Sequence, residues 1–298
     1  MATLRELKTR IGSVSSSDKI TGAMKMISSA KVRINEQALR RILPFKEQIK
    51  SIMSHLLETG VNFNSPLTVE REVSKVGIVV FGSDDGLCGA YNINVFKFLH
   101  SHVRKLRASL GDNVALEFYP VGKKMVKIVS KFAETDAAFS VKAYPGVDSK
   151  MNGEKVNEFT SHLQNEFLAG SVDKVEVVFM QFHSISRQRP EVTQIFPVDQ
   201  SAVLSQGASA APDNKLYIFE PDPNSIFNQA LPMFVLSSMQ EITIENRASE
   251  QAARVMAMQS ANDNAKKLLE ELQLEYNKLR QQSITTELLD IIGGQVER

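Results

Sequence analysis

The chain has 298 residues, of which 43% are hydrophobic, 23% charged and 7% aromatic, with 35 Lys and Arg against 34 Asp and Glu. Its single cysteine excludes an internal disulfide framework and a Cys-x-x-Cys metal cluster. No apolar run reaches the roughly 18–20 residues that a membrane-spanning helix needs. The first ten residues, MATLRELKTR, lack the apolar stretch of a signal peptide, so we expect a cytosolic, reduced compartment.

The balanced total charge hides a segregation along the chain. Residues 1–50 carry 11 basic and 4 acidic residues, whereas residues 225–298 carry 7 basic and 10 acidic residues. The residues between these segments have a net charge of −3. The basic N-terminal segment is either a solvated helix face or a docking surface for an acidic partner.

The N-terminal residues have a helical pattern. Thr3 and Glu6 fit a capping box at its start. Farther along, a stripe with alternating spacings of four and three residues predicts a coiled-coil seam, made by Ile20, Met24, Ile27, Lys31, Ile34 and Ala38.

The C-terminal residues repeat this pattern over a longer stretch. No proline follows Pro232 and no glycine comes before Gly293, which favours one continuous helix over several short ones. Small residues near position 250 allow a partner helix to approach closely. The predicted seam consists of Met258, Ala261, Ala265, Leu268, Leu272, Tyr276 and Leu279.

The middle of the chain alternates between strand and helix patterns. Strands are expected at 76–81, 115–121, 139–144, 175–182, 192–198 and 216–219, and helices at 92–110, 123–132 and 153–168. Strand and helix alternate first and strands then follow one another, which predicts an α/β layer with a mixed sheet.

The predicted fold class is therefore α/β, with a long antiparallel coiled coil of the N- and C-terminal helices and an inserted Rossmann-like α/β domain. Long helices are stabilised mainly by packing of their apolar faces, so we expect these two helices to pair with each other. We divide the chain into an N-terminal coiled-coil helix (1–60), an α/β foot domain (72–220) and a C-terminal helix (225–298) that pairs with the first.

The segment most typical of an enzyme is the strand-to-helix corner at residues 82–90, GSDDGLCGA. Doubly wound folds bind ligands at such corners, but this one matches neither a dinucleotide fingerprint nor a phosphate loop. Asp84 and Asp85 lack a third metal ligand nearby in the sequence, and Cys88 lacks a recognisable base. We therefore expect no catalytic residue, no metal and no cofactor, and a mechanical or scaffolding role.

Several motifs give the chain a resemblance to a known family. In chain order they lie at residues 19–26 (KITGAMKM), 82–92 (GSDDGLCGAYN), 220–223 (EPDP), 248–265 and 276–288 (YNKLRQQSITTEL). Together they resemble the γ subunits of bacterial F-type ATP synthases, in the same order and over nearly the whole chain. Gly22, Asp85 and Val255 depart from the residues that are usual in this family.

The resemblance implies a rotor shaft that binds no nucleotide and is not itself an enzyme. The shaft would stand inside a hexamer of α and β subunits and carry torque from a proton-driven c-ring, coupling proton flow to ATP synthesis. One copy per complex would also contact the ε subunit. The complex would lie at the bacterial plasma (inner) membrane, with this chain peripheral on the cytoplasmic side and meeting the membrane only through the c-ring.

The resemblance also assigns residues to three kinds of contact. An apolar bearing at the C-terminal end would use Leu288, Leu289, Ile291 and Ile292. Contacts of the foot with ε and the c-ring would use Tyr217, Phe219 and Glu220. Coupling to an acidic catch loop of the β subunits would use Met24, Arg254, Arg280, Gln281, Thr285 and Glu287.

Two other function classes stay open on the residues alone. An α/β enzyme with a coiled-coil appendage would need a phosphate-binding loop or an acid/base cluster, and neither appears. A nucleic-acid-binding coiled coil would fit the basic N-terminus, but such proteins usually expose stacking aromatics, and residues 1–50 contain only Phe45.

Overall fold

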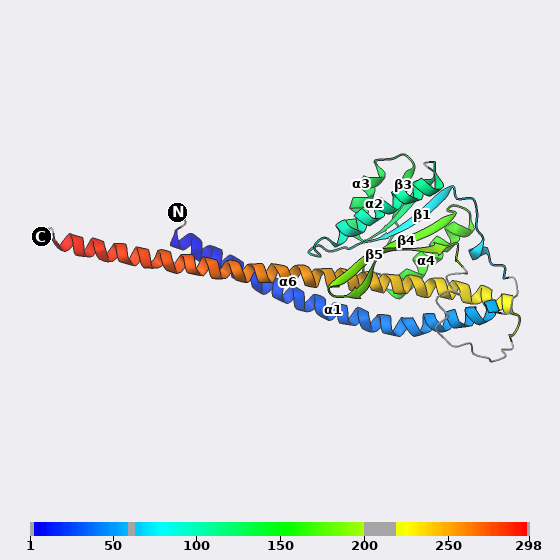
Figure 1. The fold of residues 1–298 in the computed structure, drawn as a ribbon, viewed down its shortest axis with the longest axis horizontal. Helices are drawn as coiled ribbons and strands as arrows, with labels where there is room; N and C mark the ends of the chain where they lie inside the picture. Colours follow the sequence, from blue (N-terminus) through cyan, green and yellow to red (C-terminus); the bar gives the residue numbers. More distant parts are fainter. Residues whose placement is uncertain (1–2, 59–62, 112, 200–218, 297–298) are drawn as a thin grey trace. The chain divides into compact units, whose positions relative to one another are not determined.

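In the computed structural model, which describes residues 3–58, 63–111, 113–199 and 219–296, one very long helix precedes the strands in the sequence and another follows them (Figure 1). The helices are α1 (Leu4–Glu58) and α6 (Pro223–Val296). The chain forms two compact units, one of residues 1–29 with 254–298 and the other of residues 30–253. Each unit therefore contains a stretch of both helices.

Both helix starts are fixed by local hydrogen bonds. The Thr3 amide donates to Glu6 Oε2 at 2.8 Å and the Glu6 amide donates to Thr3 Oγ1 at 3.3 Å, which confirms the predicted capping box. At the start of α6, the Ser225 amide donates to Asp222 Oδ1 at 2.9 Å, and Pro223 occupies the first turn. A proline is suited to that position because the first helical amides have no partner within the helix.

The two helices run antiparallel in the unit of residues 1–29 and 254–298, as predicted. Asn262 Nδ2 donates to the Asp18 carbonyl oxygen at 3.0 Å and to Asp18 Oδ1 at 2.7 Å. A Cβ atom on Gly22 would lie 3.4 Å from Asn262 Nδ2, so glycine lets the helices approach closely. Leu7 of α1 and Leu272 of α6 are buried farther along the pair.

The predicted seam of α1 is wrong in detail. Ile20, Ile27 and Ile34 are 60%, 57% and 64% exposed. The helix instead buries Ser28 and Val32, and then Leu39. Hydrophobicity alone selected the wrong face because small and polar residues also fill the close contacts of this pair. The C-terminal seam is closer to the prediction, with Met258 and Leu272 buried but Leu268 44% exposed.

The unit of residues 30–253 contains a five-stranded mixed sheet of order β3-β2-β1-β4-β5. The first four strands are parallel, and β5 runs antiparallel to β4. The central strand is almost wholly buried, which is why its sequence is a continuous apolar run. The strands are β1 (Lys75–Phe81), β2 (Ala115–Val121), β3 (Phe139–Val141), β4 (Lys174–Ser184) and β5 (Arg187–Phe196).

Helices cover both faces of this sheet (Figure 1). On one face lie α2 (Tyr91–Leu110) and α3 (Lys123–Ala133), with Val95, Leu99 and Met125 buried in the core between helices and sheet. On the other face lie α4 (Gly153–Leu168) and the stretches of α1 and α6 that belong to this unit. A short 3₁₀ helix, η1 (Pro66–Thr68), precedes β1. The mixed α/β fold class is confirmed.

The boundaries of most elements agree with the prediction, and the differences have simple causes. The last two strands are longer than expected because β4 and β5 form one hairpin that continues past its buried half into exposed residues. The strand expected at 216–219 lies outside the described residues except for Phe219. None of the helices in the described part of the chain has both the length and the apolar character needed to cross a bilayer.

Candidate functional site

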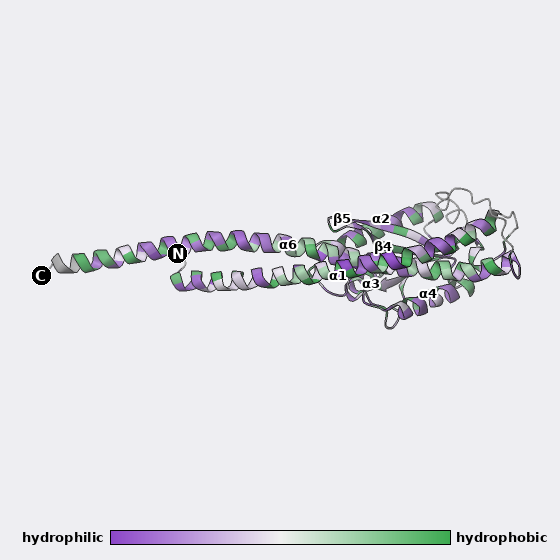
Figure 2. Ribbon diagram, turned by 90° about the horizontal axis from the view of Figure 1, so that it is seen from below, coloured by the Kyte–Doolittle hydropathy of each residue, from purple (hydrophilic) through white to green (hydrophobic). Residues whose placement is uncertain are grey.

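The far end of α6 carries most of the expected contact residues. In Figures 1 and 2, the C-terminal end of α6 extends past the N-terminal end of α1, so this stretch has no helix beside it in its own unit. Arg280 and Gln281 are exposed there, as are Thr285 and Glu287. Thr285 Oγ1 donates to the Gln281 carbonyl oxygen at 2.9 Å, so its hydroxyl is bonded to the backbone of its own helix.

The four residues of the expected bearing are all exposed. Leu288, Leu289, Ile291 and Ile292 are 55%, 62%, 64% and 59% exposed. At about 100° per residue these positions lie within an arc of about 160°, so they form one broad apolar face of the helix. An exposed apolar face of this kind is typical of a surface that meets a partner.

Met24 and Arg254 lie deeper in the same unit. Met24 is half-buried on α1, and Arg254 is 5% exposed on α6. The register set by Asp18 and Asn262 places residue 24 at the level of residue 256, about half a turn from Arg254. The antiparallel pairing thus brings these two predicted coupling residues to the same level of the helix pair.

The residues expected in the foot contacts are only partly described. Tyr217 lies outside the described residues. Phe219 is half-buried and packs against the hydrophobic core below the sheet, whereas Glu220 is exposed. The core contact of Phe219 is therefore a structural role that the sequence did not reveal.

The corner after β1, where an α/β enzyme would bind its ligand, is filled by the protein's own groups. Asp84 Oδ1 accepts from the Lys123 amide at 2.8 Å, and Asp84 Oδ2 accepts from the Ser149 amide and hydroxyl at 2.9 and 2.8 Å. Arg247 of α6 donates to the Ser149 carbonyl oxygen at 2.7 Å and to that of Met151. Asp84 therefore joins three segments of the chain, which is a structural role.

The sequence pattern did not reveal two polar residues with structural contacts, the buried Asn246 and the half-buried Arg247. Asn246 is 1% exposed and its Oδ1 accepts from the Tyr91 hydroxyl at 2.6 Å and from the Met180 amide at 3.3 Å. Burial lowers the pKa of Arg247, while Asp148 and Glu250 oppose this effect. The only sequence signal for such contacts is a polar residue at a position where the spacing of a helix seam predicts an apolar residue.

Cys88 is buried in the same corner and its Cys88→Ala variant should be nearly silent. The side chain is 3% exposed, with Sγ 3.7 Å from Ser83 Oγ and 3.6 Å from Asn92 Nδ2. Removing one small group should lower the free energy of unfolding by about 1 kcal/mol. Thermal unfolding checks the stability. ATP turnover of the assembled complex should stay within about twofold, and its loss in a fully assembled complex would contradict a structural role.

Comparison with known proteins shows the family of the chain. The family model described as ATP synthase matches residues 3–296. The ATP synthase gamma chain of Bacteroides fragilis is 38% identical over 294 residues, covering 99% of each chain. That of Heliobacterium modesticaldum is 34% identical over 301 residues, covering 99% of this chain and 98% of the relative.

The chain belongs to the ATP synthase gamma-chain family. The predicted role as the central shaft of that complex, in a subunit that is not itself catalytic, is confirmed by this membership. The two alternatives, an α/β enzyme and a nucleic-acid-binding coiled coil, are thereby set aside.

Solved structures agree in fold. The rotor of the Euglena gracilis mitochondrial ATP synthase has a chain that matches with a TM-score of 0.60 and 17% identity, covering 94% of this chain and 98% of that one. A chain of the central stalk and c-ring structure from Tetrahymena thermophila matches with a TM-score of 0.54 and 20% identity, covering 81% of this chain and 99% of that one.

Proposed function

We propose that the chain carries torque between a proton-driven c-ring and the catalytic β subunits of an ATP synthase. The observation that carries this proposal is the apolar surface of the unit of residues 1–29 and 254–298. A helix pair in water would not keep so many large side chains exposed, whereas a shaft enclosed by partners would. Besides the four bearing residues, they are Ile20, Met26, Ile27, Met256, Leu268, Leu274 and Ile284.

The enclosing partners would be the α and β subunits, with one copy of the shaft per complex. Leu288, Leu289, Ile291 and Ile292 would turn in an apolar bearing, since aliphatic side chains make no directional bonds that resist rotation. Polar and charged residues that precede the bearing in α6 would bind and release the β subunits at particular rotor angles. A rotor can in this way bias catalytic sites that differ in affinity.

Two groups of residues would transmit this coupling. Arg280, Gln281, Thr285 and Glu287 are exposed on the part of α6 that lies past the end of α1. Met24 and Arg254 would act where α1 and α6 are paired, because a change on one helix there alters the packing of the other. No cofactor or nucleotide is needed for either contact.

The foot would join the membrane part of the complex. Tyr217, Phe219 and Glu220 would lie against the ε subunit and the c-ring. The Tetrahymena structure combines a central stalk with a c-ring, and it supports this arrangement by analogy. The chain would then be peripheral, on the cytoplasmic side of a bacterial plasma membrane, and would meet the bilayer through the ring.

Changing Arg280 and Gln281 together should uncouple the complex. Arginine offers a rigid fork of donors that suits carboxylates, and glutamine adds a neutral donor. A charge-assisted contact of this kind contributes about 1.5–3 kcal/mol, more than an exposed ion pair at about 0–1. In an assembled complex carrying Arg280→Ala and Gln281→Ala, we expect ATP synthesis and single-molecule torque to fall at least threefold.

The matched control is the double variant Lys266→Ala and Lys267→Ala, which also removes exposed polar side chains from α6. ATP hydrolysis and subunit composition are measured for both, so that an assembly defect is recognised. If the two double variants behave alike, Arg280 and Gln281 are not the catch contact.

A further inference from the structure

The outward face of α2 and α3 is strongly basic. Neither helix contains an aspartate or a glutamate, although they have 20 and 11 residues. Seven exposed cations point away from the sheet, and we call them the α2–α3 basic face. They are Lys97, Arg104, Lys105, Lys123, Lys124, Lys127 and Lys131.

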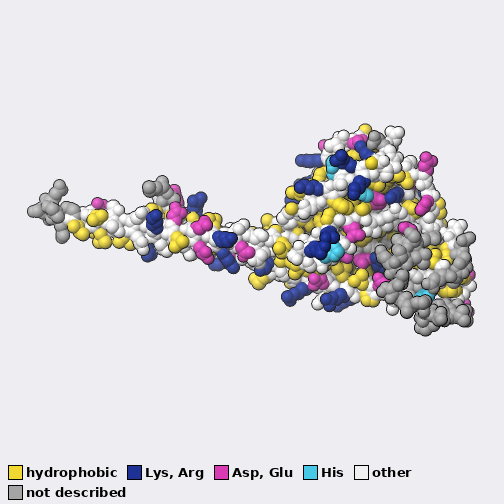
Figure 3. Space-filling model, in the orientation of Figure 1, with side chains coloured by type: hydrophobic (Ala, Val, Ile, Leu, Met, Phe, Trp, Pro, Cys, Tyr) yellow, Lys and Arg dark blue, Asp and Glu magenta, His cyan; other side chains and the backbone are white. Residues whose placement is uncertain are grey.

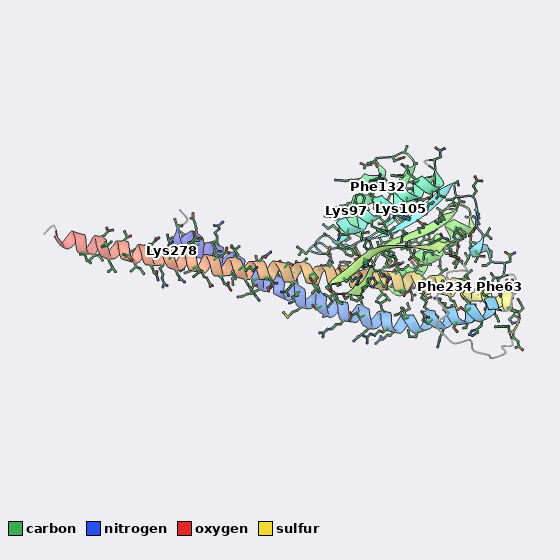
Figure 4. The ribbon with its side chains drawn as sticks, viewed as in Figure 1. Phe63, Lys97, Lys105, Phe132, Phe234 and Lys278 are labelled. Carbon is green, nitrogen blue, oxygen red and sulfur yellow. The ribbon has the colours of Figure 1, made fainter. Side chains whose placement is uncertain are left out.

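The two helices present these cations side by side. Phe132 of α3 packs against Phe96 and His100 of α2, with ring centroids 5.5 and 5.8 Å apart, so the helices are neighbours on one face of the sheet. Figure 3 shows dark blue side chains gathered over this part of the molecule. Figure 4 labels Lys97 and Lys105 on α2 and Phe132 beside them.

The nearby acidic groups do not neutralise the face. The charge of Asp136 is balanced by Arg107 at 2.7 Å. The Asp84 carboxylate keeps its charge beside Lys123, whose amide donates to it. Glu134 is the one exposed acid at the end of α3. Across the stretches of chain that the structure describes, none of the seven cations takes part in an ion pair. So many like charges repel one another, and an anionic partner would relieve that repulsion.

The shape and chemistry of the face favour a lipid surface over a protein. Protein interfaces usually have aromatic or aliphatic anchors at their centre. The side chains among these cations include Ser101, Ala108 and Ser130, Phe132 is half-buried, and the exposed Ile93 and Leu110 lie toward the two ends of α2. Separate lysines on an exposed surface can each reach a phosphate headgroup, so no groove or anchor is needed.

We propose that the α2–α3 basic face binds anionic phospholipid headgroups and holds the chain at the surface of a negatively charged bilayer. The proposal draws on the proposed function for one point, that the chain works beside a membrane. Binding would keep the chain close to membrane-embedded partners. Because the attraction is electrostatic and lacks a fixed register, salt should weaken it and the chain should still slide along the surface.

Vesicle cosedimentation of the full-length chain tests this proposal. The wild-type chain should bind vesicles of phosphatidylglycerol mixed with phosphatidylcholine, and should not bind vesicles of phosphatidylcholine alone. Neutralising four of the cations should weaken binding at least tenfold, because each basic residue near an anionic bilayer contributes separately. The variant carries Lys97→Gln, Lys105→Gln, Lys127→Gln and Lys131→Gln.

A control with the same change of net charge distinguishes the face from general charge attraction. It replaces four other exposed lysines and should weaken binding less than about threefold. Circular dichroism verifies that both variants are folded. The control carries Lys8→Gln, Lys19→Gln, Lys266→Gln and Lys267→Gln.

Three results would overturn the proposal. The first is no binding of the wild-type chain to the anionic vesicles, and the second is an equal loss in both variants. The third is tighter binding of polyglutamate or duplex DNA than of the vesicles at equal concentration of negative charge, which would assign the face to an acidic protein or a nucleic acid. The assay contains no other ATP synthase subunit, so its failure would be distinct from a failure of the shaft function.

Discussion

Replacing Gly122 by alanine should lower the free energy of unfolding by about 2–5 kcal/mol. Gly122 precedes α3 with φ +96° and ψ 135°, a backbone conformation that residues with a Cβ rarely adopt. A Cβ there would lie 3.0 Å from the carbonyl carbon and oxygen of Ser83 and 3.1 Å from the carbonyl carbon of Gly82. Those atoms are main chain at the end of β1, so they cannot rotate away.

Gly86 in the same corner is the matched control. No atom lies within 4 Å of a Cβ built on Gly86, and its φ is not in the left-handed range. Gly86→Ala should therefore be neutral or stabilise the protein by less than about 1 kcal/mol through the unfolded chain. Chemical denaturation of both variants measures the difference. If both variants changed the free energy of unfolding by similar amounts, the close packing between the turn after β1 and the turn after β2 would not contribute to stability.

The sequence predicted the secondary structure well because several elements have strong local sequence patterns. The buried strand β1 is a continuous apolar run, and α6 lacks glycine and proline over dozens of residues. Both signals depend on local chemistry alone. The capping box of Thr3 and Glu6 is likewise local, and the structure has both of its hydrogen bonds.

The prediction of the α1 seam was wrong because residue spacing does not tell whether an apolar side chain faces its own chain or a partner subunit. A surface that is apolar toward a partner subunit has the same sequence pattern as one that is apolar toward its own core. Ile20 and Ile27 fit the spacing of a coiled coil but are exposed, while Ser28 is 3% exposed. Exposure in the isolated chain thus distinguishes contact residues from core residues, which spacing cannot do.

The basic face is invisible in the sequence for a different reason. The central residues as one segment have a net charge of −3, and this sum hides two helices without any acid. Which charges meet on a surface depends on which helices are neighbours, and the sheet order determines that. Asp84 is a similar case, because its three donors come from residues 123 and 149, far away in the sequence.

Changing Glu245 to glutamine should stabilise the protein at pH 8 but not at pH 4. Burial, together with the nearby carboxylates of Glu241 and Glu191, raises the pKa of Glu245 from 4.5 to about 7, and Lys46 partly opposes this. These groups surround a cavity of about 280 Å³ between β4, β5 and the unit's stretches of α1 and α6. Lys46 pairs with Glu241 and lines the cavity together with the half-buried carboxylates of Glu191, Glu241 and Glu245, while a fourth carboxylate, that of Asp199, is exposed. Other polar groups lining the cavity are Gln181, Thr193, Gln194 and Ser238.

The sign of the effect follows from proton binding. Between about pH 4.5 and 7 the unfolded chain has an ionised Glu245 while the folded chain keeps the proton, so stability falls as pH rises through this window. The penalty is complete above about pH 7 and amounts to at most about 3 kcal/mol. Glutamine has the shape of the protonated side chain without a titratable proton, so Glu245→Gln should abolish this part of the pH dependence.

Denaturation at a series of pH values compares the wild-type chain with Glu245→Gln and with Glu275→Gln, which changes an exposed glutamate of the same helix. The stability difference between Glu245→Gln and wild type should grow from near zero at pH 4 to about 2–3 kcal/mol at pH 8. The Glu275 variant should follow the wild-type curve within about 0.5 kcal/mol, as surface substitutions usually do. A constant offset across the whole pH range would mean that Glu245 is ionised in the folded protein, and that Lys46 balances the three carboxylates better than their burial suggests.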